Sequence, residues 1–152
     1  MKEKKEYATP NSLCGTPVEA RLLDPLLPSG KELSLKKVDV LLNHGIVHCE
    51  LSVDGDVVFV ATQEWRGRGT HALSVAELQP ELEPENVEGG KDFQYGQQGA
   101  AKRVACADPK KKGWDLFAIT RIPGPQKPDL RAVKAFTENY SKAVAASPQC
   151  SR

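Results

Sequence analysis

The clearest pattern of polar and apolar positions lies at residues 46–65. Apolar side chains first occupy every second position, at Val47, Cys49, Leu51 and Val53. A period of two is typical of a strand with one buried face. The dipeptide Asp54-Gly55 favours a two-residue type I′ turn, so the chain returns as a second strand. This turn predicts Leu51 opposite Val58, and it places Phe59 on the opposite, mixed face of the hairpin.

Two short segments have the signals of helix starts. Thr16 can cap a helix that has Pro17 at its first position, and this helix is expected to last about two turns, to Leu27. Ser74 begins a second capping pattern, and that helix is expected to stop before Pro80. Both helices are short because a proline follows each start closely.

The longest predicted helix begins at Asp129 and ends near Ala146. Asp129 is a good N-cap, and apolar side chains then recur at helical spacing, at Val133, Phe136, Tyr140 and Val144. A lone amphipathic helix of this length is marginal in water, so it is expected to pack on a sheet.

Further strands complete the predicted sheet. Residues 33–40 suggest an irregular strand, and residues 100–107 with 114–122 suggest a second hairpin. Most of the acidic segment 77–92, which is rich in Pro and Gly, is expected to be a surface loop with weak internal structure. Hairpins imply an antiparallel sheet, so the expected fold is α+β: hairpins with a short N-terminal helix and a long C-terminal helix packed on the sheet.

The composition of the first residues predicts where the folded domain begins. Residues 1–12 are charged or polar, and we expect them to be a flexible tail or linker. Residues 13–150 are then expected to form a single α+β domain, which is an ordinary size for one domain.

The net charge of the chain argues against some classes of binding partner. The chain has 152 residues, with 21 Lys and Arg against 20 Asp and Glu, so its formal net charge is +1. Such a balance argues against a general polyanion-binding surface, and no nucleic-acid partner is expected. The balance hides an acidic segment at 77–92 and a basic segment at 93–152, which are expected to face each other or a partner. No apolar run is long enough for a membrane-spanning helix.

Four cysteines, Cys14, Cys49, Cys106 and Cys150, are spread along the chain. None of them has the C-x-x-C spacing of a zinc knuckle or redox motif, and an even count favours two structural disulfides. Three connectivities are open. Pairing Cys14 with Cys49 and Cys106 with Cys150 would pin each terminal helix to the sheet, and we prefer it for that reason. Four buried thiols in a cytosolic protein are the alternative.

The residues alone do not decide whether the protein is cytosolic or exported. Five of the first six residues are charged and no apolar run follows them, so they do not form a signal peptide. Either the protein is cytosolic, or an export signal has been removed ahead of residue 1.

Candidate chemistry is sparse. His44, His48 and Cys49 are of metal-ligating types, but neighbours on a strand point to opposite faces, so no metal site is expected. The chain has no G-x-S-x-G, Gly-rich phosphate loop or H-E-x-x-H motif, so neither a catalytic residue nor a cofactor is expected.

One segment has the composition of a contact surface. Binding hot spots are enriched in Trp and Arg, and the candidate interaction surface consists of Trp65, Arg66, Arg68 and His71. The alternative is a core tryptophan beside a loop.

Several segments together resemble small exported lipoproteins of actinomycete type. These are Ser-Leu-Cys-Gly-Thr-Pro at residues 12–17, His-Cys-Glu-Leu at 48–51, Val-Ala-Cys at 104–106, and the terminal helix that ends at Cys150. The resemblance covers most of residues 12–150 and rests mainly on cysteine placement. It implies an extracytoplasmic location and a removed signal with its lipid cysteine, and it implies no reaction.

The sequence therefore favours an extracytoplasmic domain, secreted or lipid-anchored to the outer face of the cell membrane, that binds and does not catalyse. Its partner is expected to be an envelope protein, a peptide, or a small apolar ligand held between sheet and helix. Contact with a membrane is expected only through the removed lipid anchor. The alternatives are an envelope-associated hydrolase with an unrecognised site and a reduced cytosolic domain.

Overall fold

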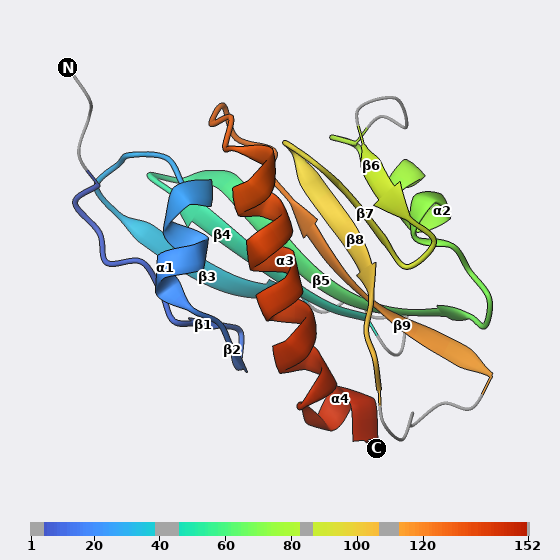
Figure 1. Cartoon of the computed structure of the whole chain (residues 1–152). Coiled ribbons are helices and arrows are strands. Elements are labelled where there is room, and N and C mark those ends of the chain that lie inside the picture. The colour runs from blue at the N-terminus through green and yellow to red at the C-terminus, as the bar shows by residue number, and fades with distance from the viewer. Residues whose placement is uncertain (1–4, 39–45, 83–86, 107–112, 152) are drawn as a thin grey trace.

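A computed structural model describes residues 5–38, 46–82, 87–106 and 113–151 of the chain. Its main element is a seven-stranded antiparallel sheet with the strand order β3-β4-β5-β9-β8-β7-β6 (Figure 1). The strands are β3 (Leu33–Val38), β4 (Ile46–Val53), β5 (Asp56–Gly67), β6 (Glu88–Gly90), β7 (Phe93–Gly96), β8 (Gly99–Arg103) and β9 (Trp114–Arg121). Both predicted hairpins, β4-β5 and β8-β9, are present.

Helices lie on both faces of this sheet. The long helix α3 (Leu130–Ala145) crosses one face, and the shorter α2 (Ala72–Glu77) packs against the other (Figure 1). The remaining elements are the two-stranded hairpin β1 (Ser12–Leu13) with β2 (Thr16–Pro17), α1 (Ala20–Leu23), the 3-10 turn η1 (Asp24–Leu26), and α4 (Pro148–Ser151). The expected α+β class is confirmed. None of the helices described is long and apolar enough to cross a membrane.

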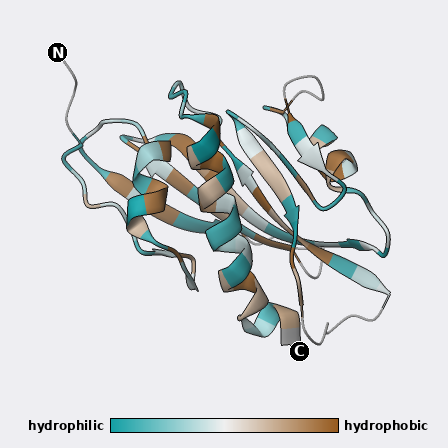
Figure 2. Ribbon diagram, in the orientation of Figure 1, coloured by the Kyte–Doolittle hydropathy of each residue, from teal (hydrophilic) through white to brown (hydrophobic). Residues whose placement is uncertain are grey.

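The main core lies between α3 and the sheet. The predicted stripe is confirmed, because Val133, Phe136, Tyr140 and Val144 are all fully buried. The ring of Phe136 meets Phe59 of β5 edge-on, with the ring centroids 5.3 Å apart. Asp129 caps the helix as expected, since its side chain accepts a hydrogen bond from the backbone N–H of Arg131. Figure 2 shows hydrophobic segments of the central strands behind this helix.

A second, smaller core lies on the opposite face. Alternate residues of β8 and β9 point to the two sides of the sheet, so Phe117 and Ile119 face away from α3 and pack against Ala72 and Val75 of α2. Helix α2 thus covers part of this face of the sheet.

The predicted register of the first hairpin is wrong beyond its turn. Asp54 and Gly55 adopt the expected positive φ angles of 52° and 88°. A β-bulge then shifts the pairing between Leu51 and Ser52, so Leu51 lies opposite Phe59 and not opposite Val58. The extra residue turns Phe59 and every second residue after it to the α3 face.

The predicted starts of the two short helices are also wrong. Thr16 and Pro17 belong to β2, because Cys14 and Gly15 take positive φ angles and make a tight turn after β1. Helix α1 begins only after Glu19. Helix α2 begins two residues before Ser74, and the Ser74 N–H donates to the carbonyl of His71.

The segment expected to be a tail is partly folded. Tyr7 packs against the main core, and its hydroxyl donates to the carbonyl of Pro28. Lys5 contacts Asp24, and the hydroxyl of Thr9 donates to the Asp24 carboxylate at 2.6 Å. Residues 5–9 therefore contact the folded domain, because an aromatic side chain at position 7 gives the segment apolar surface to bury.

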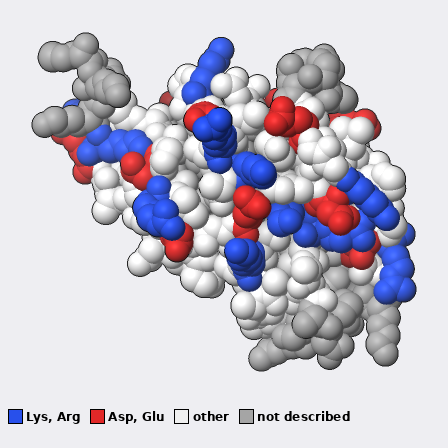
Figure 3. Space-filling model, viewed as in Figure 1, with Lys and Arg blue, Asp and Glu red and all other residues white. Residues whose placement is uncertain are grey.

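The acidic segment is not wholly a loop, since β6 forms the edge of the sheet. Described residues of the acidic segment face the basic segment, which is one of the two arrangements expected from the sequence. Asp92 lies 3.1 Å from Arg103, and Glu81 lies 2.7 Å from Arg121. On the α3 face, Lys and Arg side chains alternate with Asp and Glu (Figure 3).

Candidate ligand-binding cavity

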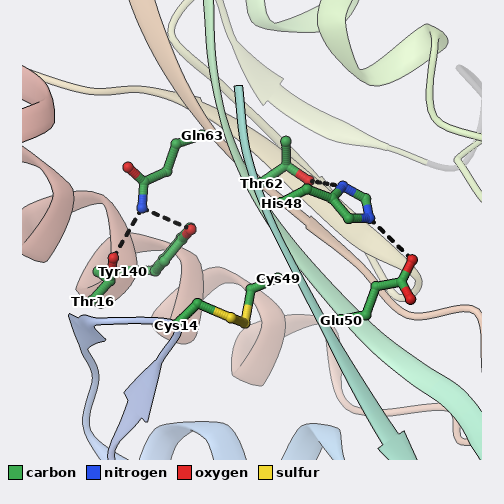
Figure 4. Close-up of a disulfide and its surroundings, with 8 residues drawn as sticks. All are labelled: Cys14, Thr16, His48, Cys49, Glu50, Thr62, Gln63 and Tyr140. Carbon is green, nitrogen blue, oxygen red and sulfur yellow. Dashed lines mark hydrogen bonds and ion pairs between the residues drawn. A yellow bond between two sulfur atoms is a disulfide. The ribbon is translucent and has the colours of Figure 1, made fainter. Parts of the chain in front are cut away.

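Two disulfides join the chain ends to the sheet. Cys14 bonds Cys49 of β4, and Cys106, just beyond β8, bonds Cys150 of α4 (Figure 4 shows the first). The preferred pairing is confirmed, and the four cysteines leave no free thiol. The first bond fixes the β1-β2 hairpin, and through it α1, against β4. The second fixes the C-terminal end of α3.

The candidate interaction surface is split between the two faces of the sheet. Trp65 is only 7% exposed and lies in the main core, so the alternative reading as a core tryptophan is correct for its position. Arg66 is the next residue on β5 and points to the other face, where it pairs with Glu64. Arg68 and His71 lie in the loop before α2. The structure therefore does not bring Trp65 together with the other three residues.

A hydroxyl, an imidazole and a carboxylate form a chain on the face away from α3 (Figure 4). The Thr62 hydroxyl lies 3.3 Å from His48 Nδ1, and His48 Nε2 lies 3.3 Å from a Glu50 carboxylate oxygen. Alternation along β4 places His48 and Glu50 on one face. Thr62 joins them because the bulge shifts the parity of β5. The order hydroxyl, base and carboxylate is the order found in nucleophilic triads.

The surroundings of this chain favour a structural role. Thr62 lies in the middle of β5, which pairs with β4 on one side and β9 on the other. Backbone N–H groups in a strand paired on both sides are used by the sheet, so they cannot serve as oxyanion donors. The two distances are also at the long end for hydrogen bonds.

A second polar cluster lies inside the main core, on the other side of β5 (Figure 4). The Gln63 amide donates to the hydroxyls of Thr16 and Tyr140, at 3.0 and 3.3 Å. Burial raises the pKa of Tyr140, although the Gln63 hydrogen bond opposes the change. Tyr140 therefore stays a neutral phenol. This cluster ties β2, β5 and α3 together through satisfied buried polar groups.

The described residues line an open cavity of about 570 Å³ at the N-terminal end of α3. Three segments that are far apart in sequence form it: the chain after α2, the β7-β8 turn, and the start of α3. It is lined by Glu81, Leu82, residues 96–98, Lys127, Asp129 and Leu130. This volume is within the usual range for small-molecule sites. The cavity is not the expected space between sheet and helix, which buried side chains of α3 fill.

An ion pair fixes the charge on one wall of the cavity. Glu81 accepts hydrogen bonds from Nε and Nη2 of Arg121, at 2.8 and 2.7 Å. Burial raises the pKa of the Glu81 carboxyl, but the hydrogen bonds and positive charge of Arg121 outweigh it and hold this pKa below its usual value. The hydrogen bonds to Glu81 likewise raise the pKa of Arg121. Both groups stay charged, so Glu81 is suited to accept hydrogen bonds and not to transfer protons near neutral pH.

The other charges of the cavity also balance. Lys127 and Asp129 carry opposite charges on exposed positions of the segment that leads into α3. Gln97 and Gln98 supply uncharged amides from the β7-β8 turn. With Glu81 compensated by Arg121, the walls offer many hydrogen-bonding groups and almost no net charge.

Metal-ligating residues do not converge among the residues that the structure describes, which contain no group of three His, Cys, Asp or Glu side chains able to hold an ion. Cys49 is bonded to Cys14, and His44 lies outside the described residues.

Comparisons with protein-family models, with curated proteins and with solved structures found no match for this chain.

Proposed function

We propose that this chain is an extracytoplasmic domain that binds a ligand and does not catalyse a reaction. The observation that carries the proposal is the pair of disulfides, which join both ends of the chain to one sheet. Disulfides of this structural kind persist in oxidising compartments, whereas the cytosol keeps most thiols reduced. The resemblance to exported actinomycete-type lipoproteins supports the same location.

The cavity at the start of α3 supports binding as the activity. Its size suits a small molecule, and its wall carries carboxylate, amide and ammonium groups whose charges compensate one another. Sites of this kind orient a ligand with a few placed polar groups. A small, uncharged molecule with several hydroxyl or amide groups fits these walls better than an ion or an apolar molecule.

Two experiments test the proposal. Protease treatment of intact cells that produce the full-length protein tests its location, with a cytosolic protein as the control. An extracytoplasmic domain is digested or released while the control survives, and equal survival of both proteins contradicts the location.

For the cavity, amide chemical shifts are followed while a panel of small sugars, polyols and amides is added. Saturable shifts at Gln97, Gln98 and Leu130 support the site, and shifts spread over the whole surface contradict it.

A hydrolase is the second candidate, because Thr62, His48 and Glu50 are arranged as a hydroxyl, base and carboxylate. Chromogenic esters and a peptide library test it with the wild-type chain and with Thr62→Val, which keeps the side-chain shape. Turnover that is lost in Thr62→Val would establish the hydrolase and refute the non-catalytic proposal. Equal background rates with both proteins refute the hydrolase.

A further inference from the structure

The outermost strand β3 presents an open edge of the sheet. Among the described residues β3 pairs only with β4, and its four central residues, from Ser34 to Lys37, are exposed. In an antiparallel edge strand every second residue turns its N–H and C=O groups outward, where another strand can bond them. The opposite edge strand β6 is only three residues long and contains two glycines, so it offers a poorer template.

The side chains along this edge are apolar and basic. Pairing with β4 puts Leu35 and Lys37 on the α3 face, and Ser34 and Lys36 on the other. Leu35 is 40% exposed, which makes it one of the few large apolar side chains on the surface of the described residues. An added strand would therefore find an apolar contact at Leu35 and positive charge on both sides of the sheet.

The two lysines have no acidic partner among the described residues. Glu50 lies opposite Lys36 in the register, but its carboxylate contacts His48 and no ion pair joins it to the lysine. A bound carboxylate would thus meet cations that are not already neutralised.

The same charges disfavour a second copy of the chain as the occupant. Two antiparallel β3 strands would bring four lysines together along six residues of each strand, and like charges across a strand pair are destabilising. Lysines on an edge protect a protein from pairing with itself for this reason. They attract a strand of the opposite charge.

We propose that β3 docks an extended acidic peptide segment of a partner protein, which adds an eighth strand to the sheet. Main-chain hydrogen bonds to β3 hold the segment, carboxylates pair with Lys36 and Lys37, and an apolar residue packs on Leu35. This mode is β-strand addition, in which the backbone gives affinity and alternate side chains give specificity. The site is separate from the cavity at the start of α3, so either one can fail without the other.

The test uses a terminally blocked peptide as long as β3, in which a central Glu-Glu pair is flanked by Val, so that one carboxylate lies on each face of the sheet. Its controls are a Lys and Val peptide of the same pattern, and the acidic peptide with alternate backbone nitrogens methylated. Binding is followed by amide chemical shifts of the whole chain. The acidic peptide is expected to shift amides of β3, to bind more weakly as salt screens the charges, and to lose most of its affinity on methylation.

The matched protein variants are Lys36→Glu/Lys37→Glu and, as a control with the same charge change, Lys91→Glu/Lys142→Glu. All four positions are exposed, so both variants are expected to fold with unchanged disulfides. The first variant is expected to bind the acidic peptide at least about tenfold more weakly than the wild type and to bind the Lys peptide more tightly. The control variant is expected to change either affinity little. Equal loss in both variants, equal binding of both peptides, or the absence of shifts in β3 would overturn the proposal. Shifts at Gln97 and Gln98 report the cavity in the same spectra, so the two sites are judged independently.

Discussion

The bond between Cys106 and Cys150 gives the sharpest stability prediction, because its contribution can be worked out from the chain it closes. The two residues are 44 positions apart in sequence. In the chain-entropy model a loop of this length lowers the entropy of the unfolded state by an amount worth about 4 kcal/mol near room temperature. The double variant Cys106→Ala/Cys150→Ala is expected to lose about this much free energy of unfolding. Alanine is preferred to serine because Cys150 is only 2% exposed, and a hydroxyl there would be buried.

Urea unfolding followed by circular dichroism measures the loss, with the slope of the transition as a check on the unfolded state. The variant Cys14→Ala/Cys49→Ala is the matched comparison. Its cysteines are 35 positions apart, so the same model gives a loss within about 0.3 kcal/mol of the first. A loss below about 1 kcal/mol for either variant, with the remaining bond intact by mass, would refute the view that the disulfides hold the terminal elements on the sheet.

Two further predictions concern packing and pH. A Cβ at Gly30 would lie 2.2 Å from a side-chain atom of Val53, so Gly30→Ala is expected to cost about 1–3 kcal/mol in urea unfolding. Gly67→Ala, where a Cβ meets open space, is expected to change stability by less than about 0.5 kcal/mol, and equal losses would contradict the packing argument. The pKa of Glu81 is lowered beside Arg121, so the ion pair adds to the free energy of unfolding at pH values above the usual carboxyl pKa. This stabilisation is lost as the pH falls through the folded-state pKa of Glu81. Glu81→Gln is expected to be less stable at neutral pH and to lose less stability on acidification, and an unchanged pH profile would contradict this pairing.

The long helix could be predicted from sequence because many positions agree on one period. Four buried residues over the 16 residues of α3 share a face, and Asp129 caps its start. The cysteine pairing could be predicted for a related reason: Cys106 and Cys150 lie at the ends of elements whose order along the chain was already clear.

The bulge in the first hairpin could not be predicted in the same way. Val58, Phe59 and Val60 are all apolar, so a period of two does not reveal which of them is the extra residue. The consequence reaches further along β5, because one extra residue reverses the face of everything after it. That reversal places Trp65 in the core and Thr62 beside His48.

The cavity carries no local signal in the sequence. Its walls come from residues 81–82, 96–98 and 127–130, and none of these segments forms a motif by itself. Only the sheet order, with α2 and α3 on opposite faces, brings these segments to one end of the molecule. The open edge of β3 is likewise a property of strand order, although Lys36 and Lys37 are residues of the type that protects edge strands.

The central claim is that both disulfides form in the cell where the protein works. The most direct measurement blocks free thiols in intact cells with an alkylating reagent and then maps the cysteine peptides of the purified protein without reduction. We expect no alkylated cysteine, one peptide that links Cys14 to Cys49, and one that links Cys106 to Cys150. Four alkylated cysteines, or a peptide linking Cys14 to Cys106 or Cys150, would contradict it.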